Sequence, residues 1–368
     1  MKITCSKSNL LNGVNIVLKA VPAKTTMPIL ECIILKVTDQ SVQMIANDME
    51  LGIQTEIDAF VEEPGMVAVN AKVFSEIIRK LPENDVVIQA DEDYNISIVC
   101  EKAKFNILGK SGEEFPFLPE IERDQSIVLS QFTLKELIRQ TVFSISDSES
   151  NRIMTGELFE IRQDNLRVIS LDGHRISIRR TKLKEAYDDN QVIVPGKTLI
   201  EVSKILSGEM SDEVKIFFTD KHIVFEFAQT VVLSRLIEGD YYKIDQMLSN
   251  DYETKITINK KELLSCIDRA TLLIKESEKR PIIINITDGG MELKINSAIG
   301  SMNEEIDIAK EGKDILIGFN PRFLMDALRV IDDEEVDIYL FNPKAPCFIK
   351  DKEENYIYLI LPVNFLAA

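Results

Sequence analysis

The stretch Lys72–Leu81, Lys-Val-Phe-Ser-Glu-Ile-Ile-Arg-Lys-Leu, occurs three times in related form in this chain of 368 residues. Related segments begin at Lys197 and Arg322, each 125 residues after the last: Lys-Thr-Leu-Ile-Glu-Val-Ser-Lys-Ile-Leu and Arg-Phe-Leu-Met-Asp-Ala-Leu-Arg-Val-Ile. Apolar residues recur at helical spacing in each copy, which predicts three amphipathic helices. A constant period of this length predicts three domains of ordinary size.

Each copy also keeps three charges: a base, an acid four residues later, and a base three residues beyond the acid. In the first copy these are Lys72, Glu76 and Arg79. Core packing explains the repeated apolar face but not the repeated charges, because exposed ion pairs contribute only a few tenths of a kcal/mol. On spacing alone, a functional cationic face and an ordinary solvated face are equally supported.

The composition limits the classes of function. Lys and Arg number 43 against 61 Asp and Glu, so the net charge is −18 and the surface as a whole repels phosphate. A basic helix face is therefore a local departure from the general charge. The five cysteines form no Cys-x-x-Cys pair and predict free thiols in a reducing, cytoplasmic compartment. With two histidines and no apolar run of membrane length, we expect no metal, no cofactor and no membrane.

The strand and helix patterns predict an α+β fold in three segments, residues 1–125, 126–252 and 253–368. Each segment reads as strand, helix, strands, helix, strands, with two helices packed on antiparallel sheets. In the second segment, separate strands are expected at 156–162 and 166–171. A Pro-containing linker is expected at 113–124.

Motifs for catalysis are weak. Gly-Lys-Ser at 109–111 and Gly-Lys-Thr at 196–198 resemble the end of a phosphate-binding loop, but Lys104 and Gln191 stand where that loop needs glycine. The sequence Asp172-Gly173-His174-Arg175 contains an acid and a histidine, yet no nucleophile motif accompanies it, and a turn between strands explains it better. A hydrolase that uses Asp172 and His174 is kept as an alternative.

Three motifs carry a resemblance to a known family: Val-Pro-Gly-Lys at 194–197, Asp-Gly-His-Arg at 172–175, and the ending Tyr-Leu-Ile-Leu-Pro-Val at 358–363. Together with the threefold repeat, they resemble the bacterial sliding clamp, the beta subunit of DNA polymerase III, along the whole chain. The resemblance implies a head-to-tail homodimer closed as a ring, with sheets outside and helices lining a hole for duplex DNA. It also implies a non-catalytic processivity factor that needs no cofactor.

The resemblance implies loose, sequence-independent contacts between helix cations and DNA phosphates, which allow sliding. The residues expected to make them are Lys24, Lys72, Arg79, Arg152, Lys197, Lys204, Arg322 and Arg329.

The resemblance further implies a pocket between the second and third domains for peptides of DNA polymerase III alpha subunit, the clamp loader, other polymerases and repair proteins. Its expected residues are Met154, Leu171, Gly173, His174, Arg175, Ile176, Tyr242, Met247, Pro346, Leu359, Leu361, Pro362 and Val363. Ordinary interdomain core is the alternative for these apolar residues. Tyr242, Gln246 and Leu171 differ from residues common in the family and are expected to affect peptide preference.

At the ring seam, an edge strand at 104–108 is expected to pair with the third domain of the other chain, because edge strands favour added partners. Phe105 and Ile107 would pack near Leu272 and Leu273. An acidic three-domain adaptor that binds only proteins remains a further alternative.

Overall fold

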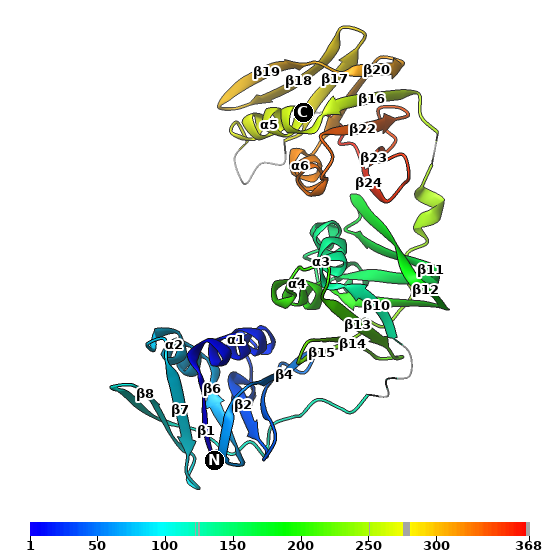
Figure 1. Cartoon of the computed structure of the whole chain (residues 1–368). Helices are drawn as coiled ribbons and strands as arrows, with labels where there is room; N and C mark the ends of the chain where they lie inside the picture. Colours follow the sequence, from blue (N-terminus) through cyan, green and yellow to red (C-terminus); the bar gives the residue numbers. More distant parts are fainter. Residues whose placement is uncertain (122, 124–125, 250, 275–279, 366–368) are drawn as a thin grey trace. The chain divides into compact units, whose positions relative to one another are not determined.

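The computed structural model describes residues 1–121, 123, 126–249, 251–274 and 280–365. Its helices and strands follow the predicted threefold order (Figure 1). The first segment contains β1 (Lys2–Ser6), α1 (Lys7–Val17), β2 (Cys32–Val37), β3 (Val42–Asn47), β4 (Leu51–Ile57), β5 (Phe60–Glu63), β6 (Gly65–Asn70), α2 (Ala71–Lys80), β7 (Asp85–Ala90), β8 (Asn95–Cys100) and β9 (Ala103–Leu108).

The second and third segments repeat this order with changes among the strands. The second contains β10 (Ser126–Ser130), α3 (Gln131–Arg139), β11 (Gly156–Leu171), β12 (Arg175–Pro195), α4 (Gly196–Ile205), β13 (Glu213–Phe218), β14 (His222–Phe227) and β15 (Thr230–Arg235). The third contains β16 (Thr254–Asn259), α5 (Lys260–Thr271), β17 (Ile282–Thr287), β18 (Gly290–Ser297), β19 (Gly300–Ile306), β20 (Ala309–Gly312), β21 (Ile315–Phe319), α6 (Pro321–Val330), β22 (Glu335–Leu340), β23 (Cys347–Lys350) and β24 (Tyr356–Ile360).

The repeated stretch forms a helix each time, as predicted: α2, α4 and α6. Asparagine side chains cap two of these helices, because an amide oxygen satisfies a backbone N–H that has no partner within the helix. Asn70 accepts from the N–H of Val73 on α2, and Asn320 accepts from the N–H of Arg322 on α6. The structure thus agrees with the helix starts that the local sequence signals.

Antiparallel strands from consecutive segments pair with each other. The chain forms two compact units, Met1–Leu134 with Ile200–Leu236, and Lys135–Leu199 with Ile237–Ala368. The first unit holds a five-stranded sheet, β5-β1-β7-β8-β9, and an eight-stranded sheet, β10-β13-β14-β15-β4-β3-β2-β6. The second unit holds a seven-stranded sheet, β11-β12-β24-β23-β22-β16-β20, and a four-stranded sheet, β19-β18-β17-β21. The pairs β15 with β4 and β24 with β12 therefore join one segment to the next.

In the third segment, α5 and α6 lie side by side against the sheets (Figure 1). Leu263 and Ile267 of α5 and Leu324 and Leu328 of α6 are buried in one apolar cluster with residues of β17 and β18. The burial of these apolar faces leaves the opposite helix faces exposed, which is what the amphipathic pattern predicts.

The second segment differs from the expected strands. Instead of two strands at 156–162 and 166–171, a single β11 runs from Gly156 to Leu171 and pairs with a long β12. The register shifts around Gln163, whose φ is +53°. A bulge of this kind absorbs irregular residues without ending the ladder, so polar residues that suggested a loop remain in the strand.

Glu157 of β11 is fully buried. The hydroxyl of Thr141 is near its carboxyl group but donates to the carbonyl of Leu137 at 2.7 Å, so neither carboxyl oxygen has a close hydrogen-bond partner among the described residues. Burial disfavours the charged carboxylate and raises the pKa of Glu157 from about 4.5 to about 8. The proton is therefore held more tightly in the folded protein than in the unfolded chain. The stabilisation that this gives is full below about pH 4.5 and is lost as the pH rises to about 8.

The substitution Glu157→Gln is accordingly expected to raise the melting temperature relative to the original chain by an amount that grows between pH 5 and pH 8. At about 2–4 °C per kcal/mol, a difference of several degrees should appear at pH 8 in thermal unfolding followed by circular dichroism. Glu185→Gln, at an exposed position of β12, is the matched control and should show no such growth. Parallel behaviour of the two variants would contradict the burial argument.

Candidate functional site

The repeated bases on α2, α4 and α6 are exposed. On α2, Lys72 and Arg79 face away from the buried Phe74 and Ile77. The corresponding bases of the other two helices are also exposed, and so are the two bases that sequence analysis took from loops: Lys197, Lys204, Arg322, Arg329, Lys24 and Arg152. All eight residues predicted to contact DNA are thus accessible to solvent.

The acids of the repeated motif do not share one role. Glu201 forms an ion pair with Lys204 at 2.8 Å, whereas Asp326 pairs with Arg175 at 2.7 Å, and Glu76 is exposed. The repeated acid therefore does not mark a common ion pair within the helix. The repeated bases are the shared feature.

Several bases of the first helices are held by acids. Lys7 of α1 lies 3.2 Å from Glu83, and Arg139 of α3 binds both Glu136 and Asp332. On α5, Arg269 binds Glu304. These pairs reduce the local positive charge on the first helices, and the Glu201–Lys204 pair does the same on α4, so pairing with acids does not by itself separate the two sets of helices.

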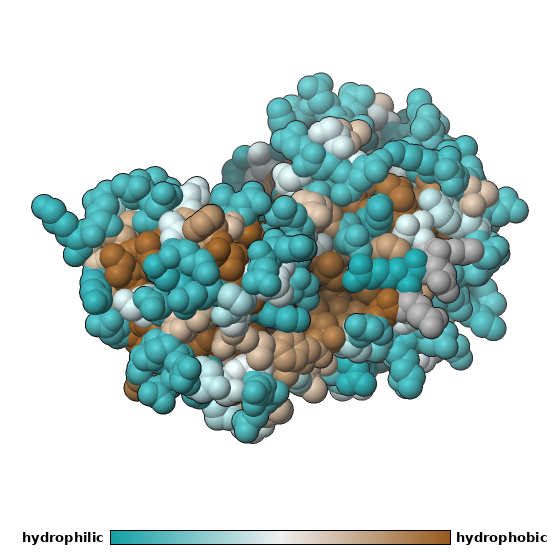
Figure 2. Space-filling model, turned by 60° about the horizontal axis from the view of Figure 1, so that its bottom comes forward, coloured by the Kyte–Doolittle hydropathy of each residue, from teal (hydrophilic) through white to brown (hydrophobic). Residues whose placement is uncertain are grey.

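The predicted partner pocket has a buried apolar base within the second unit. Leu171, Ile176 and Leu359 are 5%, 5% and 3% exposed and belong to one cluster that also contains Ile244 and Phe348. More exposed members of the predicted set are Tyr242 at 37%, Met247 at 53% and Leu361 at 37%. Exposed apolar patches lie between hydrophilic residues on the face drawn in Figure 2. The remaining apolar members are half-buried: Met154, Pro346, Pro362 and Val363.

A tight turn places two predicted pocket residues beside each other. The backbone N–H groups of His174 and Arg175 donate to Oδ1 of Asp172, at 2.9 and 3.1 Å. Gly173 has a φ of +88°, a conformation that glycine adopts without a steric cost. The N–H of Leu361 donates to the carbonyl of His174 at 2.9 Å, so the turn and the chain ending are joined through the backbone.

The same turn explains the acid and histidine without catalysis. Oδ2 of Asp172 accepts from Nε of Arg175 at 3.0 Å, so both carboxyl oxygens are engaged within the turn. The ring of His174 lies 6.0 Å from the ring of Phe323, measured between centroids. Asp172 therefore caps a turn and is not positioned to orient the imidazole as a catalytic acid would be.

Arg175, predicted for the pocket, connects the turn to α6. Its side chain is 10% exposed, and its Nη1 lies 2.7 Å from Asp326. Its Nη2 donates to the carbonyl of Phe143, and its guanidinium lies 4.5 Å from the centroid of the Phe323 ring. Sequence analysis identified Asp326 only as a repeated acid and did not foresee this contact.

The predicted seam residues are found on two different units. On the edge strand β9, Phe105 is 38% exposed, Ile107 is half-buried and Leu108 is 79% exposed. After α5, Leu272 is 77% exposed, while Leu273 packs against the core of the third segment. Leu108 was missed by sequence analysis, although it ends the predicted strand and continues its apolar pattern.

The described residues contain neither a metal-ligand cluster nor a helix suited to cross a membrane. No group of three or more His, Cys, Asp or Glu side chains there is arranged to hold a metal ion. None of the helices described has both the length and the apolar character needed to cross a membrane.

Family models for the DNA polymerase III beta subunit match almost the whole chain. The model of the N-terminal domain matches residues 1–119, that of the central domain 128–243, and that of the C-terminal domain 245–364. The chain belongs to this family, the bacterial sliding clamps. The beta sliding clamp of Bacillus subtilis is 35% identical over 99% of this chain and 100% of its own length. The Staphylococcus aureus clamp is 33% identical over 99% of both chains.

Solved structures of sliding clamps have the same fold. A Eubacterium rectale protein described as a DNA polymerase III beta subunit is 65% identical, with a TM-score of 0.96 over 99% of this chain and 100% of that chain. The sliding clamp of Bacillus subtilis is 34% identical, with a TM-score of 0.95 over 99% of each chain. The predicted family and the α+β clamp fold are thereby confirmed. Sliding clamps are processivity factors of DNA replication, so the hydrolase alternative is wrong.

The contact between Arg175 and α6 gives a stability prediction. Arg175→Lys keeps the charge but loses the planar guanidinium that reaches Asp326, Asp172 and the ring of Phe323 at once. We expect a loss of about 1–3 kcal/mol in denaturant unfolding.

Arg180→Lys is the control, because Arg180 pairs with Glu354 at 3.3 Å while one third exposed. Exposed pairs contribute up to about 1 kcal/mol, so this variant should lose less stability. Equal losses in the two variants would mean that Arg175 has no special structural role.

Proposed function

We propose that two copies of this sliding clamp, each contributing three domains, close head to tail into a ring around duplex DNA in the cytoplasm. The proposed domains are 1–125, 126–252 and 253–368, close to the segments that the three family models match. The observation that carries this proposal is that the second helix of each domain has two exposed basic residues, in a chain whose net charge is −18. The relatives' description as beta sliding clamps supports it.

The DNA contacts are electrostatic and independent of sequence. Lys72, Lys197 and Arg322 occupy equivalent positions near the starts of α2, α4 and α6, and Arg79, Lys204 and Arg329 lie seven residues later. Contacts with phosphate carry no sequence information, so such a set permits movement along the duplex. Lys24 and Arg152 supplement the helices. Acidic residues elsewhere repel DNA and discourage binding to other surfaces of the clamp.

Closure of the ring joins edge strands of two protomers. Within the part of the chain that the structure describes, β9 and β19 each pair with only one strand. An unpaired edge offers backbone donors and acceptors to another strand. Phe105, Ile107 and Leu108 of one protomer would then pack near Leu272 and Leu273 of the partner subunit and remove their apolar surface from water.

Partner proteins dock short peptides on the cluster around Leu171, Ile176 and Leu359. Exposed Met247 and Leu361 provide an apolar surface beside the turn at Gly173 and His174, whose backbone is fixed by hydrogen bonds to Asp172 and Leu361. The proposed partners are the polymerase III alpha subunit, the clamp loader, other polymerases and repair proteins. Tyr242, Gln246 and Leu171 would set the preference among their peptides.

Retention on circular DNA tests the function. A clamp loader would place the protein on nicked circles, which are then isolated by gel filtration at moderate salt before and after linearisation. A ring is retained on the circle and lost from the cut molecule, because its linkage is topological. Equal retention on both would contradict the ring, and no retention on either would favour the adaptor that binds only proteins.

Charge reversal should separate DNA contact from folding. The triple variant Lys72→Glu, Lys197→Glu, Arg322→Glu places acids near phosphates, so we expect loading on nicked circles to fall at least about tenfold and to depend less steeply on salt. The matched control is Lys182→Glu, Lys215→Glu, Lys352→Glu, which makes the same charge change at exposed strand and turn positions. Equal loading of the two variants would mean that these helix residues do not contact DNA.

The proposed seam can be tested with substitutions at the two edges of one sheet, of which the edge outside the seam is the control. Leu108 on β9 is 79% exposed and Phe60 on β5 is 70% exposed, and these strands are the two edges of the five-stranded sheet. Leu108→Asp should weaken the dimer about tenfold or more in sedimentation equilibrium, because a charge would be desolvated at the seam. Phe60→Asp should leave the dimer intact, and dissociation by both or neither variant would place the seam elsewhere.

A further inference from the structure

The junction between the first and second segments repeats the construction of the junction that carries the proposed pocket. The strands run β13-β14-β15-β4 at one junction and β22-β23-β24-β12 at the other. Val224 is opposite Leu233, which is opposite Gly52, across three strands of the first junction. The corresponding row of the second is Phe348, Leu359 and Ile176. The latter two are predicted pocket residues, so the first junction has an equivalent position.

The turn beside the pocket is also repeated. Oδ1 of Asp48 accepts from the N–H groups of Glu50 and Leu51, at 3.0 and 2.7 Å, as Asp172 does in the turn that holds His174. Met49 has a φ of +77°, close to the +88° of Gly173. A non-glycine residue is uncommon in this conformation, so the hydrogen bonds to Asp48 hold the backbone there.

The backbone contact that joins turn and strand recurs with the same length. The N–H of Arg235 donates to the carbonyl of Glu50 at 2.9 Å, just as the N–H of Leu361 donates to His174 at 2.9 Å. In the proposed pocket this contact brings the turn next to an exposed apolar side chain. In the first junction it brings the turn next to the exposed guanidinium of Arg235.

The segments that connect the first domain to the second and the second to the third also correspond in position. Leu118 and Ile121 precede Ile244 and Met247 by 126 residues, and both segments pack apolar side chains on their sheets. Leu118 lies directly over Gly52, since a Cβ added to Gly52 would stand 1.9 Å from Cδ2 of Leu118. A larger residue at position 52 would displace the segment.

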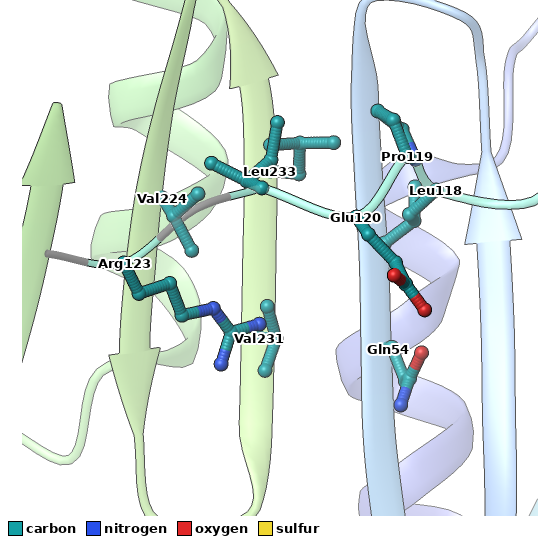
Figure 3. Close-up of a pocket in the computed structure, with 9 residues that line it drawn as sticks. Gln54, Leu118, Pro119, Glu120, Arg123, Val224, Val231 and Leu233 are labelled. Atoms are coloured by element: carbon teal, nitrogen blue, oxygen red, sulfur yellow. The ribbon is translucent and has the colours of Figure 1, made fainter. Parts of the chain in front are cut away.

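Two adjoining hollows lie along this segment, with volumes of about 420 and 280 Å³. Figure 3 shows Val224, Val231 and Leu233 of β14 and β15 beside the segment that carries Leu118 and Arg123. The larger volume is within the usual range of ligand sites, and the smaller is just below it. Both have walls from the connecting segment and a floor from the sheet, so together they form a groove.

The charges of this groove differ from those of the proposed pocket. His222 is opposite Arg235, at the place where Pro346 and Leu361 stand in the other junction. Burial, together with the charges of Arg235 and Lys221, lowers the pKa of His222, so the imidazole is neutral at pH 7. Glu50 and Glu120 also line the hollows. Arg235 shares the smaller hollow with Glu50, and Lys221, outside the lining, adds a second positive charge near His222.

We propose that this groove is a second docking site, for an extended peptide of a partner protein that carries adjacent apolar side chains followed by carboxylates. The inference rests on the proposed function of the equivalent junction as a peptide pocket. Apolar side chains would cover Val224 and Leu233 beside Leu118, and a carboxylate would bind Arg235 with both oxygens. Arg235 gives this groove a cationic partner for an acidic peptide that the apolar Leu361 position does not provide.

Methyl NMR of the full-length protein labelled at Leu and Val can report on the two sites separately. The probe is the acetylated, amidated peptide Ser-Gly-Leu-Val-Leu-Asp-Glu-Ser, and its comparison peptide has two lysines in place of Asp-Glu. Saturable shifts of the Leu118, Val224, Val231 and Leu233 methyl signals with the acidic peptide are expected, with at least about tenfold weaker binding of the lysine peptide. Absence of these shifts at millimolar peptide, or equal binding of the two peptides, would overturn the proposal.

Variants then connect the response to the groove. Arg235→Glu should weaken the response at these methyls at least about tenfold, whereas Lys352→Glu, the same type of change in the exposed turn between β23 and β24, should leave it unchanged. Gly52→Val should also weaken it by displacing Leu118, with folding checked by the other methyl signals. Wild-type affinity in both groove variants would overturn the proposal.

Failure of this inference is distinct from failure of the proposed function. The methyl signals of Leu171, Leu359 and Leu361 report on the other junction. Shifts confined to these signals would overturn the second site and leave the first standing. Shifts confined to the groove would support the second site and count against the first as the site for this peptide.

Discussion

The pairing of β4 with β15 and of β12 with β24 is the constraint on which the rest of this clamp depends. Each segment alone would leave strand edges whose backbone groups lack partners, and pairing with the next segment satisfies them. At the first pairing, the hydroxyls of Thr55 and Thr230 also share a buried hydrogen bond of 2.8 Å. The junctions produce sheets wider than one segment, and they bring a turn, two strands and a connecting segment together twice.

The exposed basic residues of the second helices are an exception to the acidic composition of the chain. Acidic residues outnumber basic ones by 18, yet the second helix of every segment keeps exposed bases at equivalent positions. Bases on both sets of helices pair with acids: Lys7 pairs with Glu83, Arg269 with Glu304 and Lys204 with Glu201. Exposed pairs of this kind add little stability, and what sets the second helices apart is that their bases occupy equivalent positions in all three segments.

Arg175 is next to a predicted pocket residue in the sequence, but its side chain makes structural contacts with α6. It follows His174, whose carbonyl accepts from Leu361, but its guanidinium reaches Asp326 on α6 and the ring of Phe323. The turn at the proposed pocket is therefore held by the same side chain that contacts the helix carrying Arg322 and Arg329.

The sequence by itself determined the helices, the threefold order and the exposed bases, because these follow from the local spacing of apolar and charged residues. It did not determine that β11 continues through Gln163, since a bulge keeps polar residues within a ladder. Nor could it pair Asp326 with Arg175, 151 residues away, or give Arg235 and His222 a common groove with Leu118. Only tertiary structure decides such contacts, because strand pairing across segments sets which distant side chains become neighbours.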